Sequence, residues 1–211
     1  HLMFREVLRK VCADLRHQVV GEAEDGRRAV ELAAETMPDL VLLDLHLPKL
    51  DGFGVVEAIR KISPETRFLV LSSHCDEYTV FRAERARVQG FVDKNTNSVA
   101  SLKQAISEVA KGRPSFSAAF LQAKAARFRD PRSFDKLLTE RERTVLSLVG
   151  EALTDEEIAQ RLEIAQETVE KHRYNLLRKL SLGTTIELVR YANTHGFTLS
   201  ARRSDDGAML P

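Results

Sequence analysis

Cysteine is scarce in this sequence, which argues against a secreted domain held together by disulfides. Only Cys12 and Cys75 are present, and they lack the paired spacing of a disulfide framework. Such usage indicates a reducing compartment and two small buried thiols. A regulatory disulfide is the alternative interpretation.

Long apolar runs and net charge are missing as well. No run approaches the ~18 residues of a membrane-spanning helix, and no polybasic or lipidation signal is present. We therefore expect a cytoplasmic protein without a membrane partner. The 32 Lys and Arg residues nearly balance the 31 Asp and Glu residues, leaving a formal net charge of +1. Overall charge identifies no partner, although a local cluster still can.

The first half of the chain alternates apolar runs with amphipathic stretches, and the 211 residues allow two modest domains. Strands alternating with helices favour a parallel sheet that is covered on both faces. A continuous apolar run such as 40–43 fits that burial. The expected strands are residues 18–23, 38–44, 67–73 and 90–94. The expected helices are residues 4–15, 27–37, 53–59, 77–87 and 99–109.

The alternation stops near Gly112, where a basic segment begins. Residues 111–136 hold seven basic residues against two acidic ones, and they include two prolines. This composition predicts a linker that is helical at about residues 118–128.

The rest of the chain follows a helical pattern. "TERE" and "TDEE" predict capping boxes, in which Thr139 with Glu142, and Thr154 with Glu157, satisfy free amides of a first helical turn. Four helices joined by short turns make a compact all-α domain, and the last residues have little to bury. The expected division is an α/β domain at 1–112, a partly helical linker at 113–136, an all-α domain at 137–196 and a disordered tail at 197–211.

Three polar residues fall where expected strands end: Asp44, Ser72 and Lys94. In a doubly wound sheet, ligands bind beyond the carboxyl ends of the strands. The three side chains suit an acyl phosphate, with Asp44 as nucleophile, Ser72 donating to a phosphoryl oxygen and Lys94 neutralising charge. Three unrelated surface residues are the alternative interpretation.

These residues carry a family resemblance. "LLDLHLPKLDG" around Asp44, "VLSSH" with Ser72 and "GFVDK" with Phe91 and Lys94 resemble the phosphoacceptor, Ser/Thr switch, aromatic switch and Lys positions of a response-regulator receiver domain. The whole chain resembles the two-domain NarL/FixJ type. The resemblance implies a flavodoxin-like 2-1-3-4-5 sheet, phosphorylation by a sensor histidine kinase, Mg²⁺ as cofactor and an active homodimer that binds double-stranded DNA.

The sequence departs from this family at the metal site. Receivers carry an acidic pair at the end of the first strand, and neither that strand nor the pair precedes His1 in this chain. Asp44 and the backbone carbonyl of His46 are the Mg²⁺ ligands that are left. We expect residues upstream of His1 to be missing from the sequence, with a degenerate receiver as the alternative.

Three further positions around the expected site are noteworthy. Arg87 stands where the family usually has Gly after the fourth helix. Glycine adopts a left-handed backbone conformation at little energetic cost, and other residues do not. His46 and His74 flank the phosphoacceptor, where each could affect the lifetime of the phosphate. Exposed rim residues are the simpler interpretation of both.

Residues 138–182 resemble a LuxR-type helix-turn-helix, whose third helix enters the major groove of DNA. Its charge is locally basic, because residues 171–179 hold four basic residues and no acidic one, although residues 137–196 have a net charge of −2. Ala165 replaces the usual Ser N-cap, and Glu170 replaces a common Lys. A plain helical bundle is the alternative. The expected DNA contacts are Thr168, Glu170, Lys171, Arg173, Asn175 and Lys179.

The sequence thus predicts a transcriptional response regulator that is switched by phosphorylation, and not an enzyme. A regulator with a degenerate receiver, indifferent to phosphate, is the second hypothesis. A haloacid-dehalogenase-like phosphatase also places an Asp at a strand end, but it requires a second Asp two residues later, where this chain has His46.

Overall fold

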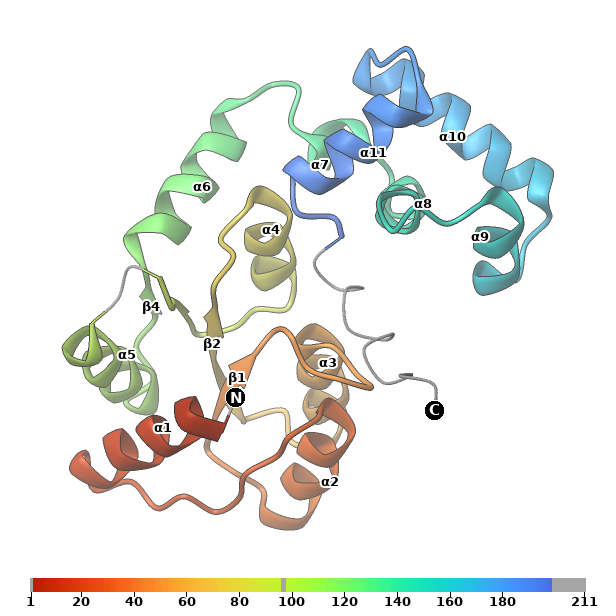
Figure 1. The fold of residues 1–211 in the computed structure, drawn as a ribbon. Coiled ribbons are helices and arrows are strands. Elements are labelled where there is room, and N and C mark those ends of the chain that lie inside the picture. The colour runs from red at the N-terminus through yellow and green to blue at the C-terminus, as the bar shows by residue number, and fades with distance from the viewer. Residues whose placement is uncertain (1, 96–97, 199–211) are drawn as a thin grey trace. The chain divides into compact units, whose positions relative to one another are not determined.

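The computed structural model describes residues 2–95 and 98–198. They form two compact units, the first from residues within 2–75 and 82–122, and the second from residues 76–81 and 123–198. Figure 1 shows the order of the elements along the chain. Among the described residues, no helix is long and apolar enough to cross a bilayer.

The first unit contains a parallel sheet with the strand order β1-β2-β3-β4. Its strands are β1 (Leu40–Asp44), β2 (Arg67–Ser72), β3 (Gly90–Asp93) and β4 (Ser115–Phe116). In the part of the chain that the structure describes, six helices lie wholly or partly in this unit. They are α1 (Leu2–Asp14), α2 (Gly26–Thr36), α3 (Gly52–Ile62), α4 (Glu77–Arg85), α5 (Val99–Ala110) and α6 (Ala118–Arg129).

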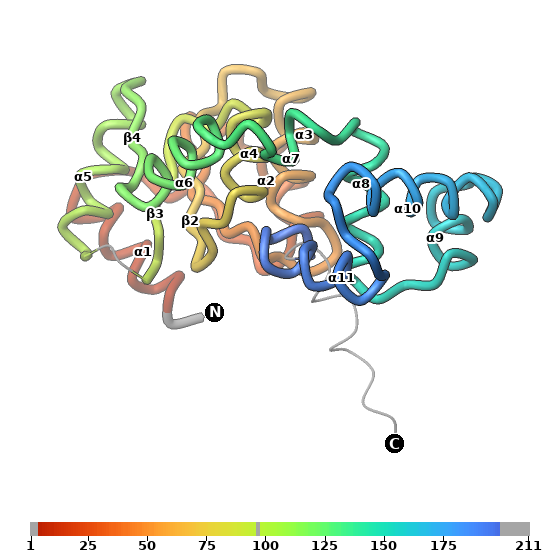
Figure 2. The backbone as a smooth tube through the Cα atoms, turned by 90° about the horizontal axis from the view of Figure 1, so that it is seen from above, coloured from red at the N-terminus to blue at the C-terminus, as the bar shows by residue number. Residues whose placement is uncertain are grey.

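Helices cover both faces of the sheet, as the alternating pattern predicts. Val11 of α1 and Ile106 of α5 are buried against Leu69 and Leu71 of β2. Side chains alternate along a strand, so Phe68 and Val70, both fully buried, point to the opposite face. Figure 1 shows α3 and α4 on that side, and Figure 2 shows α1 and α5 together in the view from above. The predicted α/β fold class is therefore confirmed.

The strand predicted at residues 18–23 does not form. These residues have no regular secondary structure, and Val19 and Val20 are 42% and 45% exposed. In a 2-1-3-4-5 sheet this segment pairs with a first strand that lies beside β1, and the described residues contain no such strand. A strand needs the amide and carbonyl groups of a neighbour, so the segment remains irregular and β1 becomes an edge strand.

The sheet continues beyond Gly112, where the expected α/β domain ended. Ser115 of β4 pairs with Gly90 of β3, and the first unit extends to Gln122. A Cβ atom on Gly90 would lie only 2.5 Å from a methyl of Leu69 and 2.8 Å from the carbonyl oxygen of Ser115. Glycine at position 90 is therefore what allows β4 to approach. A strand of two residues is too short to give a periodic signal.

The second unit is helical. Its helices are α7 (Phe134–Leu137), α8 (Glu140–Gly150), α9 (Asp155–Leu162), α10 (Gln166–Leu180) and α11 (Thr185–Thr194). Both predicted capping boxes are present, at Thr139 and Thr154, and a third that was not predicted occurs at Thr184. The buried core includes Leu146, Ile158, Val169, Leu176 and Leu188.

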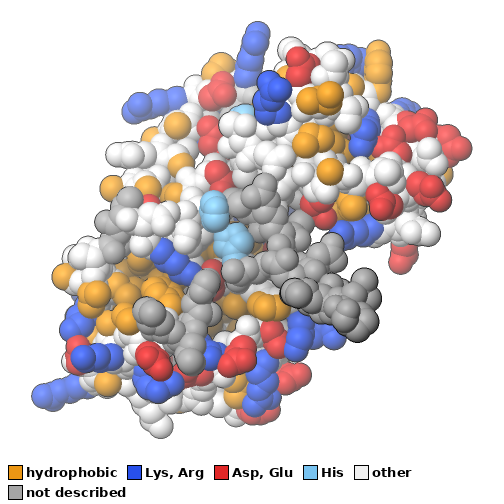
Figure 3. All heavy atoms as spheres, in the orientation of Figure 1, with side chains coloured by type: hydrophobic (Ala, Val, Ile, Leu, Met, Phe, Trp, Pro, Cys, Tyr) orange, Lys and Arg blue, Asp and Glu red, His pale blue; other side chains and the backbone are white. Residues whose placement is uncertain are grey.

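Acidic side chains gather over α9 and the start of α10 (Figure 3). This group, which we call the acidic patch, consists of the exposed residues Glu156, Glu157, Glu163 and Glu167. The patch agrees with the net negative charge of this part of the sequence. A DNA backbone would be repelled by these carboxylates, so they lower the affinity of this part of the surface for DNA.

The tail was predicted to be disordered from residue 197 onward, and this prediction is wrong for its first two residues. Phe197 and Thr198 are 0% and 4% exposed, and Ser147 donates a hydrogen bond of 2.6 Å to the carbonyl oxygen of Phe197. The aromatic ring of Phe197 gives this segment something to bury, so it completes the helical core. The remainder of the expected tail, 199–211, lies outside the described residues.

Two further expectations have outcomes in the structure. Cys12 and Cys75 form no disulfide, and both are partly exposed and not buried. Arg87 adopts a left-handed conformation with φ of 50°, the conformation expected at the position where the family usually has Gly. Its carbonyl oxygen accepts hydrogen bonds from Arg60 at 2.6 Å and Gln89 at 3.1 Å, which hold the loop in place.

Candidate phosphoacceptor site and candidate nucleic-acid interface

The three polar residues predicted at strand ends lie at the same edge of the sheet. Asp44 is the last residue of β1, Ser72 is the last of β2, and Lys94 directly follows β3. The parallel register places Asp44 opposite Leu71 and Ser72 opposite Asp93. The sheet therefore brings the expected nucleophile, hydroxyl and cation together.

Asp44 is held by hydrogen bonds to both carboxylate oxygens. The Lys94 ammonium donates to Oδ2 at 2.6 Å, and the backbone N–H of His46 donates to Oδ1 at 3.0 Å. The side chains of Asp44 and Lys94 are 22% and 16% exposed, so the pair is partly shielded from water yet open on one side. Lys94 also lies 4.7 Å from the centre of the Phe4 ring, which supports the ammonium by a cation–π contact. Phe4 is the first residue of the helix predicted at residues 4–15, and the sequence pattern gives no sign of this contact.

Ser72 is fully buried and its hydroxyl is oriented by the backbone. Its Oγ accepts a hydrogen bond of 3.1 Å from the N–H of His74, and its carbonyl oxygen accepts one of 2.8 Å from the N–H of Lys94. Because a hydroxyl carries both lone pairs and a proton, the Ser72 proton can still be donated.

Phe91, the expected aromatic switch, lies inside the first unit. It is 0% exposed, and its ring centre is 5.1 Å from that of Phe120 on α6. Phe120 in turn stacks on Phe116 of β4 at 4.7 Å. A movement of Phe91 would therefore disturb the packing of α6 as well as the strand edge.

His46 lies beside Asp44, and His74 lies beside His46. His46 Nδ1 is 3.9 Å from Asp44 Oδ1, and the rings of His46 and His74 are 5.0 Å apart between centroids. His74 is exposed and His46 is half-buried. The His46 imidazole is therefore the one that borders the carboxylate among the described contacts.

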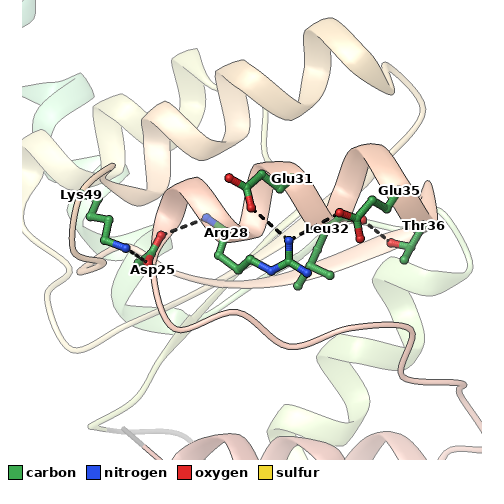
Figure 4. Close-up of polar contacts among 7 residues, drawn as sticks. All are labelled: Asp25, Arg28, Glu31, Leu32, Glu35, Thr36 and Lys49. Atoms are coloured by element: carbon green, nitrogen blue, oxygen red, sulfur yellow. Dashed lines mark hydrogen bonds and ion pairs between the residues drawn. The ribbon is translucent and has the colours of Figure 1, made fainter.

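The loop after β1 is tied to the start of α2 (Figure 4). Lys49 donates to Asp25 Oδ2 at 2.5 Å, while Asp25 Oδ1 caps α2 by accepting from the N–H of Arg28 at 2.9 Å. The Lys49 ammonium and this amide hold the pKa of the Asp25 carboxyl below its ordinary value. Farther along α2, Arg28 pairs with Glu31 at 3.0 Å and Glu35 at 3.5 Å.

The close approach between this loop and α2 requires glycine at position 26. A Cβ atom on Gly26 would lie 2.1 Å from the carbonyl oxygen of Leu50. The N–H of Gly26 donates to the carbonyl oxygen of Pro48 at 3.2 Å. Together with the Lys49–Asp25 pair, these contacts fix the segment that follows Asp44.

The described residues do not complete a magnesium site. They contain no group of three His, Cys, Asp or Glu side chains that could share a metal ion. Mg²⁺ prefers octahedral oxygen ligands, whereas the expected set offers one carboxylate, Asp44, and the carbonyl of His46. One carboxylate and one carbonyl are too few ligands for the ion, so the described residues do not fit it.

In the second unit, α9 and α10 form the two helices of the predicted helix-turn-helix. Ile158 of α9 and Val169 and Leu176 of α10 are fully buried and join the two helices in one core. Ala165 occupies the N-cap of α10 in an extended conformation and makes no side-chain cap hydrogen bond, as the sequence predicts. The long helix is therefore fixed by its apolar face and not by its cap.

The structure separates the expected DNA contacts into two groups. Thr168, Glu170 and Lys171 are exposed on the first turns of α10, and Asn175 is half-buried. The other two, Arg173 and Lys179, form ion pairs with acidic residues of the same unit.

Arg173 and Lys179 each pair with an acidic residue of another helix. Arg173 Nε lies 2.7 Å from Asp155 Oδ1, and its Nη2 donates to the carbonyl oxygen of Leu153 at 3.3 Å. Lys179 Nζ donates to Glu142 Oε2 at 2.7 Å. Burial alone would raise the pKa of Glu142, but hydrogen bonds from Lys179 and Thr139 outweigh it and hold that pKa below the ordinary value. The two cations thus stabilise the fold of this unit.

Two exposed residues in the second half of α10 were not among the expected contacts. Tyr174 is 66% exposed, and Arg178 is also exposed. Tyr174 lies four residues after Glu170, and therefore on the same helix face. An aromatic residue on a polar helix face was the available signal in the sequence.

Comparisons with known proteins match both halves of the chain. A model of the response regulator receiver domain matches residues 1–107, and a model of the bacterial regulatory proteins of the LuxR family matches residues 136–192. The Fimbriae Z protein of Salmonella typhimurium is 34% identical over 180 residues, covering 84% of this chain and 85% of that protein. The response regulator protein VraR of Staphylococcus aureus is 32% identical over 178 residues, covering 84% and 85%.

Solved structures show the same fold. Salmonella enterica serovar Typhimurium RcsB, bound to a promoter in the presence of a phosphomimetic, has a TM-score of 0.61 at 21% identity and covers 92% of this chain and 94% of that one. A LuxR-family two-component response regulator from Aurantimonas has a TM-score of 0.51 at 32% identity, covering 54% and 81%. The matched families are regulators and not enzymes, which removes the support for a phosphatase. The chain belongs to the DNA-binding response regulators of the NarL/FixJ type, which combine a receiver domain with a LuxR-type helix-turn-helix domain.

Proposed function

We propose that the chain is a transcriptional regulator whose binding to double-stranded DNA is switched by phosphorylation of Asp44. The observation that carries this proposal is the Asp44 carboxylate, held at the carboxyl edge of the sheet 2.6 Å from the Lys94 ammonium. A phosphoryl group on Asp44 would add negative charge beside a cation that is already in reach. The buried Ser72 hydroxyl has a proton to donate to the same group.

The phosphoryl donor in this proposal is a phosphohistidine of a sensor kinase. An Asp44 oxygen attacks the phosphorus, the nitrogen–phosphorus bond breaks, and the histidine leaves. Lys94 stays charged and turns toward the new phosphoryl oxygens. The Ser72 hydroxyl then turns to donate a hydrogen bond to one of them. Phe91 would then repack against Phe120, which passes the change to α6.

For the DNA-binding half, we propose that α10 is the recognition helix that enters the major groove. Thr168, Lys171 and Asn175 would bind phosphates or base edges. Arg173 and Lys179 would first have to leave their acidic partners, so we assign them a smaller part in DNA contact. Operators with two half-sites call for a homodimer, and the RcsB structure bound to a promoter supports this use of the fold.

We include Mg²⁺ in this proposal only on the condition that further acidic ligands are supplied. Receiver domains in general bind Mg²⁺ at an acidic pocket, and Asp44 would be one ligand if an acidic pair were supplied before His1. The regulator would act in the cytoplasm, where the chromosome and the kinase domain of a sensor are accessible.

The proposal is tested with the full chain and a small-molecule phosphoryl donor. Acetyl phosphate should add one phosphoryl group to the chain, measured by intact mass, and none to an Asp44→Asn variant. Fluorescence anisotropy with a randomised DNA duplex should then show tighter binding of the phosphorylated chain. If the variant takes up phosphate equally, Asp44 is not the acceptor.

A regulator with a phosphate-independent receiver is the second candidate. It is favoured by the lack of a three-ligand metal group among the described residues. Under this hypothesis neither acetyl phosphate nor beryllofluoride changes the oligomeric state in size-exclusion chromatography, while DNA binding is retained. A shift to a dimer with either reagent, absent in Asp44→Asn, would exclude it.

A further inference from the structure

The exposed face of α10 carries a row of side chains suited to contact base edges. Gln166, Glu170, Tyr174 and Arg178 follow one another at intervals of four residues, and all four are exposed. Residues at this spacing lie above one another on one helix face. Two of the expected contacts, Arg173 and Lys179, are instead bound to acidic residues of their own unit. This row can therefore approach DNA without breaking either of these ion pairs.

Glu170 is oriented before any DNA contact. The side-chain amide of Gln166 donates to Glu170 Oε1 at 3.1 Å. A carboxylate has a second oxygen that can accept further hydrogen bonds. The hydrogen bond from Gln166 therefore restricts the Glu170 side chain but leaves an oxygen available to accept from a base. An oriented side chain loses less freedom on binding than a mobile one.

We propose that Glu170 is a specificity-determining residue that selects cytosine. A carboxylate is an acceptor only. In the major groove, guanine and the heteroatoms of thymine present acceptors, whereas cytosine presents its N4 amino donor, and glutamate is suited to accept from it. Adenine also has an amino donor, but its N7 acceptor lies beside it and faces the carboxylate unfavourably. This inference rests on the proposed DNA-binding role of α10.

The charge of Glu170 has a second consequence. Phosphates repel a carboxylate, so Glu170 lowers the affinity of the chain for every DNA sequence. This loss is offset only where a cytosine donates a hydrogen bond to Glu170. Such a residue increases discrimination at the expense of general affinity. The acidic patch nearby, which includes Glu167, lowers general affinity in the same way but without a base to recognise.

The test is a selection from a randomised DNA duplex with the full chain, followed by sequencing. The wild-type chain should enrich a cytosine at one position of each half-site. Glu170→Gln should lose that preference by roughly tenfold, while binding unselected duplex more tightly. Glu170→Lys should favour guanine at the same position, because lysine donates to guanine O6 and N7. The matched control, Glu167→Gln, removes the same charge one turn away and should keep the cytosine.

The outcomes separate this inference from the function on which it rests. A wild-type chain that enriches no sequence, and whose affinity does not depend on salt, contradicts the DNA-binding function and the role of Glu170 together. A wild-type chain that enriches a site without the cytosine, or whose cytosine persists in Glu170→Gln, contradicts only the role of Glu170. Loss of the cytosine in Glu167→Gln as well would show a charge effect and would also overturn it.

Discussion

Lys179, near the end of α10, donates a hydrogen bond of 2.7 Å to Glu142, the capping-box carboxylate of α8. The same carboxylate accepts from the N–H and hydroxyl of Thr139 at 2.8 and 2.9 Å. The Glu142 side chain is 5% exposed, so little water is available to replace a lost partner. The candidate DNA-binding helix is thus fixed to the first helix of its unit by a buried charge.

Loss of this cation should destabilise the second unit. Lys179→Met leaves the Glu142 carboxylate with neutral donors only, and we expect the free energy of unfolding to fall by about 1–3 kcal/mol. Urea denaturation followed by circular dichroism measures it. Lys171→Met, which removes an exposed Lys from the same helix, should stay within about 0.5 kcal/mol of the wild type. Equal effects of the two substitutions would show that the Lys179–Glu142 bond contributes nothing to stability.

The same pair should make stability depend on pH. The pKa of Glu142 is lower in the fold than its ordinary value of 4.5. The ionised carboxylate therefore contributes fully above about pH 4.5 and loses its contribution as the pH falls through the lowered pKa. The difference in urea midpoint between the wild type and Glu142→Gln should shrink below about pH 4. A difference that grows on acidification would contradict the assignment.

The sequence predicts the contacts that depend on near neighbours. Capping boxes need a Thr and a Glu three residues apart, and both predicted boxes form. Asp44 and Lys94 meet because the carboxyl ends of parallel strands share one edge, which strand pattern alone indicates. These features follow from local spacing and from the direction of the chain.

Contacts that depend on distant partners could not be predicted in this way. Residues 18–23 have the apolar pattern of a strand, but a strand also requires a neighbour, and none is present beside them in the described residues. Arg173 has the same position in the sequence pattern whether it faces DNA or Asp155. Only the packing of α9 on α10, which brings Asp155 within 2.7 Å, decides this.

The unfilled N-cap of α10 should be open to improvement. Ala165 has the extended backbone of an N-cap residue but offers no side-chain acceptor. Ala165→Ser supplies a hydroxyl that can accept from an amide of the first turn, and we expect a gain of about 1 kcal/mol in the free energy of unfolding. Ala126→Ser, in the exposed interior of α6, is the control and should give no gain, since Ser is a poorer helix former than Ala. A gain in both would point to a general effect of serine.

Lys94 and Lys49 should differ in their effect on phosphorylation, although each pairs with an Asp. Lys94 contacts the proposed acceptor, whereas Lys49 contacts Asp25 at the start of α2. Lys94→Met should therefore abolish the change in DNA affinity that acetyl phosphate produces, and Lys49→Met should preserve most of it. Anisotropy titrations with and without acetyl phosphate measure both. A response that survives in Lys94→Met would show that this cation is not needed.

Salt dependence should distinguish the exposed Lys171 from the bound Lys179. A lysine that neutralises a phosphate releases a counterion, so its removal should reduce the slope of log affinity against log salt by about 0.9. We expect this reduction for Lys171→Met and none for Lys179→Met, because Lys179 is held by Glu142. Titrations of a randomised duplex at several salt concentrations, under conditions where both variants are folded, measure the slopes. The reverse result would mean that Lys179 leaves Glu142 when DNA binds, and that α10 approaches DNA through the face that is packed within the unit.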